Sequence, residues 1–551
     1  MNNNYLSFLP LGGCGDVTKN MYVYEYDGQI LLVDCGIGFA DETMLGVELL
    51  LPDITYLKNT KSKIVGMLIT HGHEDHMGAL PFLLPQLPDF PIFATSFTAA
   101  LANEKLNEFG VNKKVQEVTF EKGQEVKLGV FSASFIRVTH SVPDTAHIVI
   151  KTPIGTIYHG SDYKFDLTPY DGKRTDFAQI ARIGSDGVLA LVTDCLGSER
   201  KGYTPSEAGL EKHFADAMRE CSGKCLITTY SSNINRIKQA IDAATMLKKR
   251  VCFVGRSLIN TVEIAKQKGL IQLPKGMEVS LDQIKQVRDK DLLLLVAGSQ
   301  GQENSSMTRI AEGIHRDVKL SSQDMVIFSA DTIPGNEVLV NALIDAITKV
   351  GATVLYSDIT PDFHVSGHGS EQDMLLLLSL VQPRYVIPTS GTQKHMGAYQ
   401  QIAKRFGYQN NVIMIGEDGQ EITISSSMIR FGKKIPIRTV YLDEISGEKV
   451  EEYVLLDRQK LSSEGMIVVI ATIDGNTKEL LQPVEVIFKG ISEDTQEMQR
   501  FIVNTLRKTL SMQSTQIKPV VMRKLLSETI EKTLHQQYKR KPLILPIIID
   551  M

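Results

Sequence analysis

The feature that most constrains this chain is a dense run of metal-binding side chains directly after a buried strand. An apolar run from Ile64 to Thr70 predicts the strand, and three histidines and two carboxylates fall within the six residues that follow it. The end of a strand can point His71 and His73 at one place, while Asp75 and His76, where the next helix begins, point at a neighbouring place. With only 12 histidines in 551 residues, this grouping indicates two adjacent metals rather than a polar loop.

The mixture of imidazole and carboxylate is typical of a hydrolytic metal centre. Imidazole nitrogen binds zinc and similar first-row metals, and carboxylate accepts zinc, manganese or magnesium. Two further candidates follow apolar runs in the same way, His140 after Phe135–Thr139 and Asp162 after Gly155–Gly160. Because two adjacent metals need more ligands than the first cluster supplies, we expect both side chains to join it.

Length and composition are those of an ordinary multidomain globular protein. A chain of 551 residues predicts about two to four domains. The net charge of -5 neither requires nor excludes a nucleic-acid partner, because an acidic total can hide a basic patch. No apolar run reaches the ~20 residues of a membrane span, and residues 1–5 lack signal-peptide features, so we expect a cytoplasmic protein without a membrane partner. The six scattered cysteines are expected to be reduced thiols.

Strand and helix patterns alternate along most of the chain. Residues 5–34 predict short strands broken by glycine turns, and residues 76–140 predict helices and strands in layers. The early glycines lack the dinucleotide-binding spacing, which excludes that function. From about residue 205 to 355, strand followed by helix repeats and predicts a parallel sheet. Ser232 and Asn233 follow one of these strands at the ligand-binding edge, although helix capping explains them equally well.

The order of the candidate ligands resembles the metallo-β-lactamase superfamily. The resemblance rests on Asp34 after the first strands, the cluster His71–His76, His140 and Asp162. It implies an α/β fold, a four-layer αββα sandwich. In that pattern the first metal is bound by His71, His73 and His140 and the second by Asp75 and His76, with Asp162 bridging them. Asp75 then belongs to both the metal site and the catalytic residues.

An inserted parallel-sheet domain between two parts of such a sandwich is the beta-CASP arrangement found among nucleases. Several short sequence motifs are similar to those of one branch, bacterial ribonuclease J: Asn20-Met21, Tyr203–Glu207, Ser232–Arg236, Gly298–Gly301, Ile333–Glu337, His364–Gly369 and Lys541–Ile548. The similarity covers nearly the whole chain. It implies a sandwich from 1–204 and 356–425, a beta-CASP domain at 205–355, a linker at 426–450 and a small α+β C-terminal domain at 451–551 that supports dimerisation.

The same resemblance implies a ribonuclease with 5′-3′ exonuclease and endonuclease activity in mRNA decay and rRNA processing. Two divalent metals, zinc first and manganese or magnesium as alternatives, would activate water at the phosphodiester. His368 is the expected proton donor, oriented by Asp194. Phosphate-binding residues would be Ser232, Asn233, His364 and Ser366. The expected partners are single-stranded RNA, favouring 5′-monophosphate ends, and a second copy or a paralogue in a dimer or higher oligomer.

One position departs from the family pattern. Ser390 stands where the family has a histidine that completes the second metal's ligands, and Thr392 replaces the usual glutamate. Serine is a poor metal ligand, and His395, five residues on, is the other candidate donor. The alternative hypothesis is therefore a weak or inactive paralogue that contributes RNA binding and dimer contacts. The surviving ligands favour the enzyme, and the inserted domain disfavours a small-molecule hydrolase.

Overall fold

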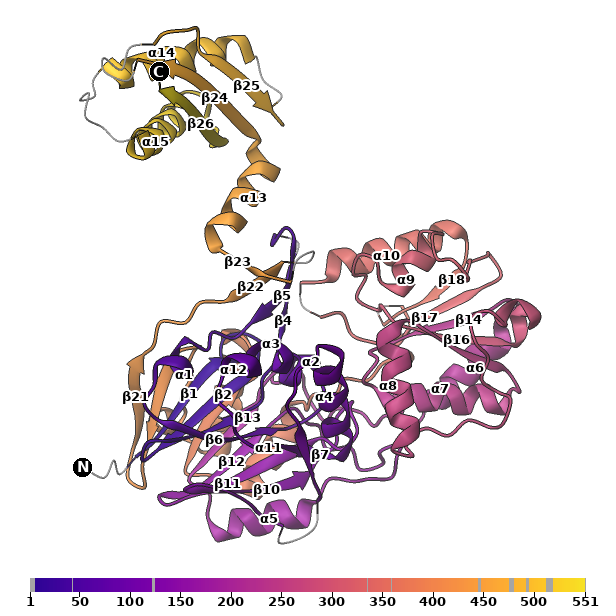
Figure 1. The fold of residues 1–551 in the computed structure, drawn as a ribbon. Coiled ribbons are helices and arrows are strands. Elements are labelled where there is room, and N and C mark those ends of the chain that lie inside the picture. Colours follow the sequence, from indigo (N-terminus) through magenta and orange to yellow (C-terminus); the bar gives the residue numbers. More distant parts are fainter. Residues whose placement is uncertain are drawn as a thin grey trace. The chain divides into compact units, whose positions relative to one another are not determined.

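The computed structural model describes residues 5–41, 43–120, 124–333, 335–357, 359–443, 447–474, 480–491, 495–511 and 519–550. Pro334, within the motif Ile333–Glu337, lies outside these residues. The chain divides into two compact units, Met1–Phe39 with Leu50–Val440, and Ala40–Leu49 with Tyr441–Met551 (Figure 1). The first unit contains two domains, here called the sandwich domain and the inserted domain.

The sandwich domain is built on two sheets. The first has eight strands in the order β21-β20-β1-β2-β3-β6-β7-β8. Their bounds are β1 (Leu6–Gly12), β2 (Met21–Tyr26), β3 (Gln29–Val33), β6 (Lys63–Ile69), β7 (Ile92–Thr95), β8 (Val115–Val118), β20 (Gln420–Ile424) and β21 (Ile429–Lys434). Its first strands pair antiparallel, whereas β3, β6, β7 and β8 run parallel. The carboxyl ends of the parallel strands therefore lie at one edge of the sheet.

The second sheet has six strands in the order β19-β13-β12-β11-β10-β9. Their bounds are β9 (Val126–Leu128), β10 (Phe131–Arg137), β11 (Ala146–Thr152), β12 (Gly155–Gly160), β13 (Ala190–Asp194) and β19 (Tyr385–Thr389). Buried side chains of both sheets, such as Tyr24, Leu31, Ile148 and Ile157, belong to one hydrophobic core. Burying both inner faces supplies the main stabilisation of such a sandwich.

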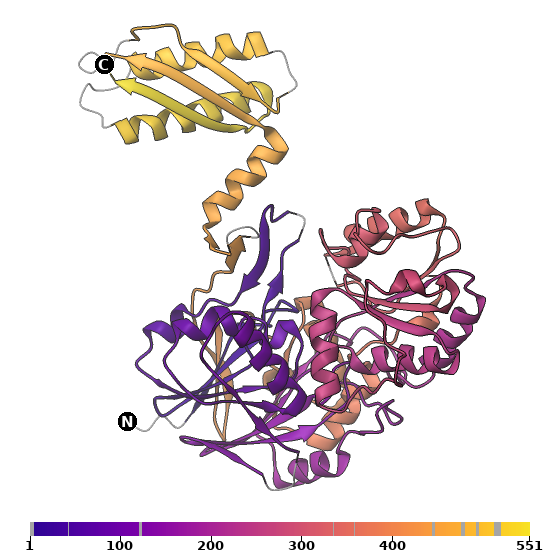
Figure 2. The ribbon, with the colours of Figure 1, turned by 45° about the vertical axis from the view of Figure 1, so that its right-hand side comes forward.

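Helices cover the outer faces of the sandwich (Figure 2). They are α1 (Thr55–Asn59), α2 (Glu74–Met77), α3 (Leu80–Leu83), α4 (Ser96–Glu108), α5 (Phe177–Asp186), α11 (Glu371–Val381) and α12 (Gln393–Phe406). Helix α4 contacts the first sheet through β7 and β8, while α12 contacts β19 of the second, and α11 packs between α5 and α12. The result is the predicted αββα layering.

The inserted domain has a five-stranded parallel sheet in the order β15-β16-β14-β17-β18. Its strands are β14 (Cys225–Thr228), β15 (Arg250–Val254), β16 (Leu292–Val296), β17 (Met325–Phe328) and β18 (Thr353–Leu355). Its helices are α6 (Leu210–Glu220), α7 (Ile234–Met246), α8 (Arg256–Gln267), α9 (Ser306–Ala311) and α10 (Glu337–Val350). The three inner strands, β16, β14 and β17, are fully buried, as expected for a parallel sheet covered on both faces.

After the insertion the chain returns to both sheets of the sandwich. Strand β19 pairs parallel with β13, and β20 pairs antiparallel with β1, the first strand of the chain. The predicted fold class, a metallo-β-lactamase-type sandwich interrupted by a parallel-sheet domain, is confirmed. Strand β21 extends the first sheet past residue 425, and the predicted domain boundaries stay a prediction.

The second unit contains a three-stranded sheet, β25-β24-β26, with two long helices. Its elements are β22 (Val440–Asp443), β23 (Lys449–Val450), α13 (Glu452–Glu464), β24 (Met466–Ile473), β25 (Glu485–Lys489), α14 (Thr495–Ser511), α15 (Pro519–Tyr538) and β26 (Leu543–Asp550). The short strand β4 (Gly38–Phe39) precedes its segment Ala40–Leu49, and β5 (Val47–Leu51) begins within that segment. On β26, Ile544 and Ile548 are buried in the core, while Leu545, Ile547 and Ile549 are exposed. One face of this sheet is therefore packed and the other is apolar and open.

Candidate metal centre

The site begins where two parallel strands end side by side. Asp34 follows β3, and its carboxylate accepts hydrogen bonds from the backbone N–H of Thr70 at 2.8 Å and from the Thr70 hydroxyl. Its second oxygen lies 2.8 Å from Nδ1 of His76. Asp34 thus holds the start of the histidine loop, and it leaves Nε2 of His76 facing the site.

Three imidazole nitrogens converge beside this loop. Nδ1 of His73 lies 3.1 Å from Nε2 of His71 and 3.1 Å from Nε2 of His140. Burial lowers the pKa of all three rings, that of His140 to about 3, so each is neutral at physiological pH. Four ligands at zinc–nitrogen distances of ~2.0–2.1 Å stand roughly 3.3 Å apart in a tetrahedron, so the observed spacing fits a shared metal ion.

The outer nitrogen of each ring has its own partner. Nδ1 of His71 contacts the Thr70 and Ser161 hydroxyls, and Nε2 of His73 contacts the Ser141 hydroxyl at 3.2 Å. Nδ1 of His140 lies 2.7 Å from the carbonyl oxygen of Gly367, to which it donates. Such partners fix the tautomer and leave the inward nitrogen as an acceptor for a cation.

Asp162 lies between the two halves of the cluster. Its Oδ2 is 3.3 Å from Nε2 of His76 and 3.8 Å from Nε2 of His71. Asp75 completes the second group, with Oδ2 3.6 Å from the same His76 nitrogen. The Oδ1 atom of Asp162 is buried and has no hydrogen-bond partner, which a bound cation would supply. The cluster therefore fits metal ions, and all six predicted ligands meet there.

His368 and Asp194 form a pair at the edge of the cluster. Nδ1 of His368 lies 2.9 Å from Oδ2 of Asp194, and its Nε2 lies 3.9 Å from Oδ2 of Asp162. Burial lowers the pKa of His368, but the charges of Asp194 and Asp162 more than offset this effect and raise the pKa to about 9. At neutral pH the ring is a charged donor that faces the candidate metal centre.

The side chain of Asn20 separates Ser390 from the group formed by Asp75, His76 and Asp162. Its hydroxyl donates to Oδ1 of Asn20 at 3.2 Å, and Nδ2 of Asn20 lies 3.1 Å from Nε2 of His76. The amide of Asn20 therefore lies between Ser390 and that nitrogen. His395 turns elsewhere, since its ring contacts the Thr392 hydroxyl and the Glu199 carboxylate. It joins no metal-type cluster among the described residues.

The predicted phosphate-binding residues follow β14 and precede α11. Asn233 accepts the backbone N–H of Arg236 and caps α7, and Ser232 directly precedes it. The Ser366 hydroxyl accepts the backbone N–H of His368 at 3.2 Å. Both ring nitrogens of His364 have neighbours, Arg236 at 3.3 Å and Asp331 at 3.0 Å. Only the hydroxyl of Ser232 makes no side-chain hydrogen bond among the described residues.

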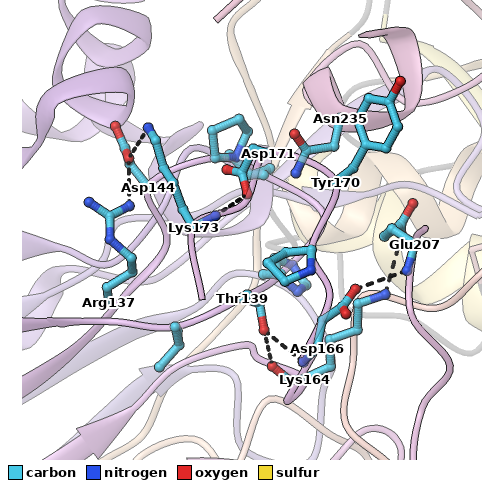
Figure 3. A pocket seen from close by; sticks show the side chains of 15 residues that line it. Arg137, Thr139, Asp144, Lys164, Asp166, Tyr170, Asp171, Lys173, Glu207 and Asn235 are labelled. Carbon is cyan, nitrogen blue, oxygen red and sulfur yellow. Dashed lines mark hydrogen bonds and ion pairs between the residues drawn. The ribbon is translucent and has the colours of Figure 1, made fainter. Parts of the chain in front are cut away.

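A buried ion pair that the sequence analysis missed lies where the chain crosses between the two domains. Arg236 is fully buried and binds both oxygens of Glu207, and it also donates to the carbonyl oxygen of Val365 and to Ser329. Glu207 reaches back to Lys164 at 3.4 Å (Figure 3). One guanidinium thus joins the segment at Glu207, where the chain enters the inserted domain, to the segment at Val365, where it returns to the sandwich domain. Glu207 ends one of the family-like motifs of the sequence and Arg236 ends another, but nothing local indicates that the two side chains meet.

Known proteins match along the whole chain. Family models match residues 14–188 (metallo-beta-lactamase superfamily), 222–347 (ribonuclease J, beta-CASP domain), 361–414 (Zn-dependent metallo-hydrolase RNA specificity domain) and 453–551 (ribonuclease J C-terminal domain). Ribonuclease J2 of Bacillus subtilis is 31% identical over 100% of this chain and 99% of its own length. The chain belongs to the ribonuclease J family. The ribonuclease J of Thermus thermophilus is 33% identical, covering 99% of this chain and 96% of its own.

One solved structure shares the fold of this ribonuclease J family member at low identity. A protein of unknown function from Enterococcus faecalis V583 aligns with a TM-score of 0.54 and 15% identity, covering 76% of this chain and 100% of its own. Among the described helices, none combines the length and the hydropathy that a membrane crossing requires.

Proposed function

We propose that this chain is a metal-dependent ribonuclease that hydrolyses RNA phosphodiester bonds as a 5′-3′ exonuclease and endonuclease, in RNA decay and maturation. The observation that carries the proposal is the position of Asp162, whose Oδ2 lies 3.3 Å from the His76 nitrogen of the metal-type cluster and 3.9 Å from Nε2 of His368. A charge-stabilising centre and a proton donor therefore face one reacting position, in a chain that matches ribonucleases J over its full length.

The proposed ligand assignment follows the two groups of donors. One divalent ion would be held by His71, His73 and His140, and another by Asp75 and His76, with Asp162 shared between them. Zinc fits the three-imidazole group, and manganese or magnesium are alternatives at the carboxylate-rich group. When bound, such ions lower the pKa of water and neutralise charge on the transferred phosphoryl group.

The protein's own groups complete the reaction. As water attacks phosphorus and the bond to the leaving oxygen breaks, that oxygen needs a proton, and the charged His368 is placed to give one from Nε2. Asp194 keeps the ring charged and oriented through Nδ1. The Gly367 carbonyl oxygen orients His140, so the same loop positions both the proton donor and one ligand.

The preferred substrate would be single-stranded RNA, with 5′-monophosphate ends favoured and bound near Ser232, Asn233, His364 and Ser366. These groups would contact the backbone and not the bases, which gives binding without sequence preference. We also propose self-association or pairing with a paralogue through the C-terminal unit, whose sheet exposes Leu545, Ile547 and Ile549. The cytoplasm is the proposed location.

A second candidate function is supported by Ser390. With serine at this position, and with the Asn20 amide 3.1 Å from Nε2 of His76, the second group keeps only Asp75, His76 and Asp162 as ligands. A weakly active or inactive member of the family would then contribute RNA binding and dimer contacts to a ribonuclease complex.

One experiment separates the two functions. Purified protein is incubated with 5′-monophosphorylated single-stranded RNA and manganese or zinc, beside a His73→Ala/Asp75→Ala variant, and bound metal is counted by elemental analysis. Activity well above that of the variant supports the enzyme, whereas equal activity leaves the binding role. A large gain of bound metal and rate in Ser390→His would show that the second group is incomplete in the natural chain.

A further inference from the structure

Asp331 lies at the carboxyl edge of the inserted sheet, beside the proposed phosphate contacts. It follows β17, and 42% of its side chain is exposed. Its Oδ2 lies 3.0 Å from Nε2 of His364 and 3.8 Å from the guanidinium of Arg200. The donors that would otherwise meet an RNA phosphate thus contact a carboxylate of the protein itself.

The backbone around Asp331 is fixed by hydrogen bonds from neighbouring loops. Its carbonyl oxygen accepts from the Tyr230 hydroxyl at 2.7 Å and from Nε2 of Gln300 at 2.9 Å. The Gln300 carbonyl oxygen in turn accepts the backbone N–H of Ile333 at 2.8 Å. These bonds hold the carboxylate in place at the rim of the site.

The contact with Arg236 fixes which nitrogen of His364 carries the proton in the neutral ring. Nδ1 of His364 lies 3.3 Å from an N–H group of Arg236, and a guanidinium can only donate, so Nδ1 is the acceptor. In the neutral ring the proton is then on Nε2, the atom that faces Asp331. This nitrogen makes no hydrogen bond among the described residues, and the Asp331 carboxylate stands 3.0 Å from it, where an oxygen of a terminal phosphate would lie.

Tyr230 lies beside this pair, since its hydroxyl donates to the Asp331 carbonyl oxygen at 2.7 Å. Burial raises the pKa of Tyr230, and the charges of Asp331 and Asp75 raise it further. Burial raises the pKa of Asp331, but contact with His364 and the charge of Arg200 lower it below the usual value. The carboxylate is therefore ionised at neutral pH.

We infer that Asp331 is a specificity-determining residue whose carboxylate lies at His364 and Arg200, where a terminal phosphate would bind, so that this chain favours 5′-monophosphorylated over 5′-hydroxyl RNA only weakly. A terminal phosphate carries about -1.5 to -2 charges and must approach a like charge in a partly buried site, whereas an internal linkage carries one. The inference rests on the proposed function, because the RNA 5′ end must enter at this edge.

The test measures binding, so it does not depend on cleavage. A single-stranded 2′-O-methyl oligonucleotide with a 3′ fluorophore carries either a 5′-phosphate or a 5′-hydroxyl, and fluorescence anisotropy gives the two Kd values. For the wild type we expect them to agree within about threefold. In Asp331→Asn the 5′-phosphate form should bind about tenfold or more tightly than the 5′-hydroxyl form, because a like charge has been removed. Asp282→Asn, an exposed site that precedes β16, removes the same charge and should keep the wild-type ratio.

Three outcomes decide against the inference. A wild-type preference above tenfold for the 5′-phosphate form overturns it without any variant, and so does an unchanged ratio in a folded Asp331→Asn. Asp331→Ser provides a second variant should the asparagine form fail to fold, as judged by thermal unfolding. If the wild type binds neither oligonucleotide, both the inference and the proposed RNA function are lost, whereas binding of both with an unchanged variant ratio overturns the inference alone.

Discussion

Asp194→Asn removes the charge that keeps His368 protonated. The two side chains are 2.9 Å apart, and the pKa of His368 is raised from 6.5 to about 9 although burial alone would lower it. Asparagine keeps the shape but not the charge, so we expect the pKa of His368 to fall by about 2 units, equivalent to ~3 kcal/mol. Asp162 remains as the other charge that favours the protonated ring.

The sign of the pH effect follows from the role of the ring. Proton donation needs the charged form, so wild-type activity should fall only as pH rises through about 9, and the variant's activity should fall as pH rises through about 7. At pH 8 about nine-tenths of the wild type but only about one-tenth of the variant would have a protonated His368. The variant should therefore be about tenfold slower at this pH from protonation alone, with the difference shrinking toward pH 6.

Two measurements check this prediction. Initial rates on 5′-labelled single-stranded RNA between about pH 6 and 10 give the basic limb, with exposed Asp186→Asn as the matched control. Nitrogen NMR of the His368 ring in metal-free protein gives its titration directly and needs no activity. Two results with Asp194→Asn would refute the assignment of Asp194 as the source of the raised pKa. One is a loss of activity at the same basic pH as in the wild type, and the other is a His368 ring that still titrates above pH 8.

Three other substitutions test separate parts of the structure. Arg236→Met removes the closer partner of the buried Glu207 carboxylate and leaves it only Lys164 at 3.4 Å, so the free energy of unfolding should fall by about 3–5 kcal/mol in urea titrations, with a smaller loss in Arg236→Lys. Gly367→Ala would place a Cβ 2.7 Å from Cε1 of His140, so bound metal and RNA cleavage should both fall at least tenfold while the melting temperature changes little. Burial raises the pKa of Asp418 from 3.8 to about 7, which destabilises the fold as pH rises from about 4 to 7, so Asp418→Asn should gain about 2 kcal/mol at pH 8 and almost nothing at pH 4. Equal melting-temperature gains at both pH values would contradict that last expectation.

The metal-type cluster was predictable because its residues are close in sequence or stand at strand ends. His71, His73, Asp75 and His76 follow a single strand, and the period of the apolar residues before them is enough to place them at one edge of a sheet. Predicting that Asp162 joins the cluster also required the assumption that the strand before it ends near the histidine loop. The architecture was predictable for the same reason, since strand and helix periods are local.

Contacts between distant loops were not predictable from local patterns. Nothing near His364 in the sequence indicates that Arg236 and Asp331 would lie beside its two nitrogens, because three separate loops must meet before those atoms approach. A local pattern can also predict a ligand site where the side chain has a structural role. The residues around Asn233 fit both a phosphate site and a helix cap, and in the structure the side chain caps the helix. Burial decides such cases, and burial is a property of the whole fold.

The hydrogen bond from His140 to Gly367 joins residues that are 227 positions apart. On the ribosome, at roughly 5–20 residues per second, His140 would be made about 10–45 seconds before the carbonyl group that orients it, and His368 arrives with that carbonyl. A nascent chain would therefore contain every candidate metal ligand well before it has either its proton donor or the fixed tautomer of His140. The complete site would thus form only after the inserted domain has been synthesised.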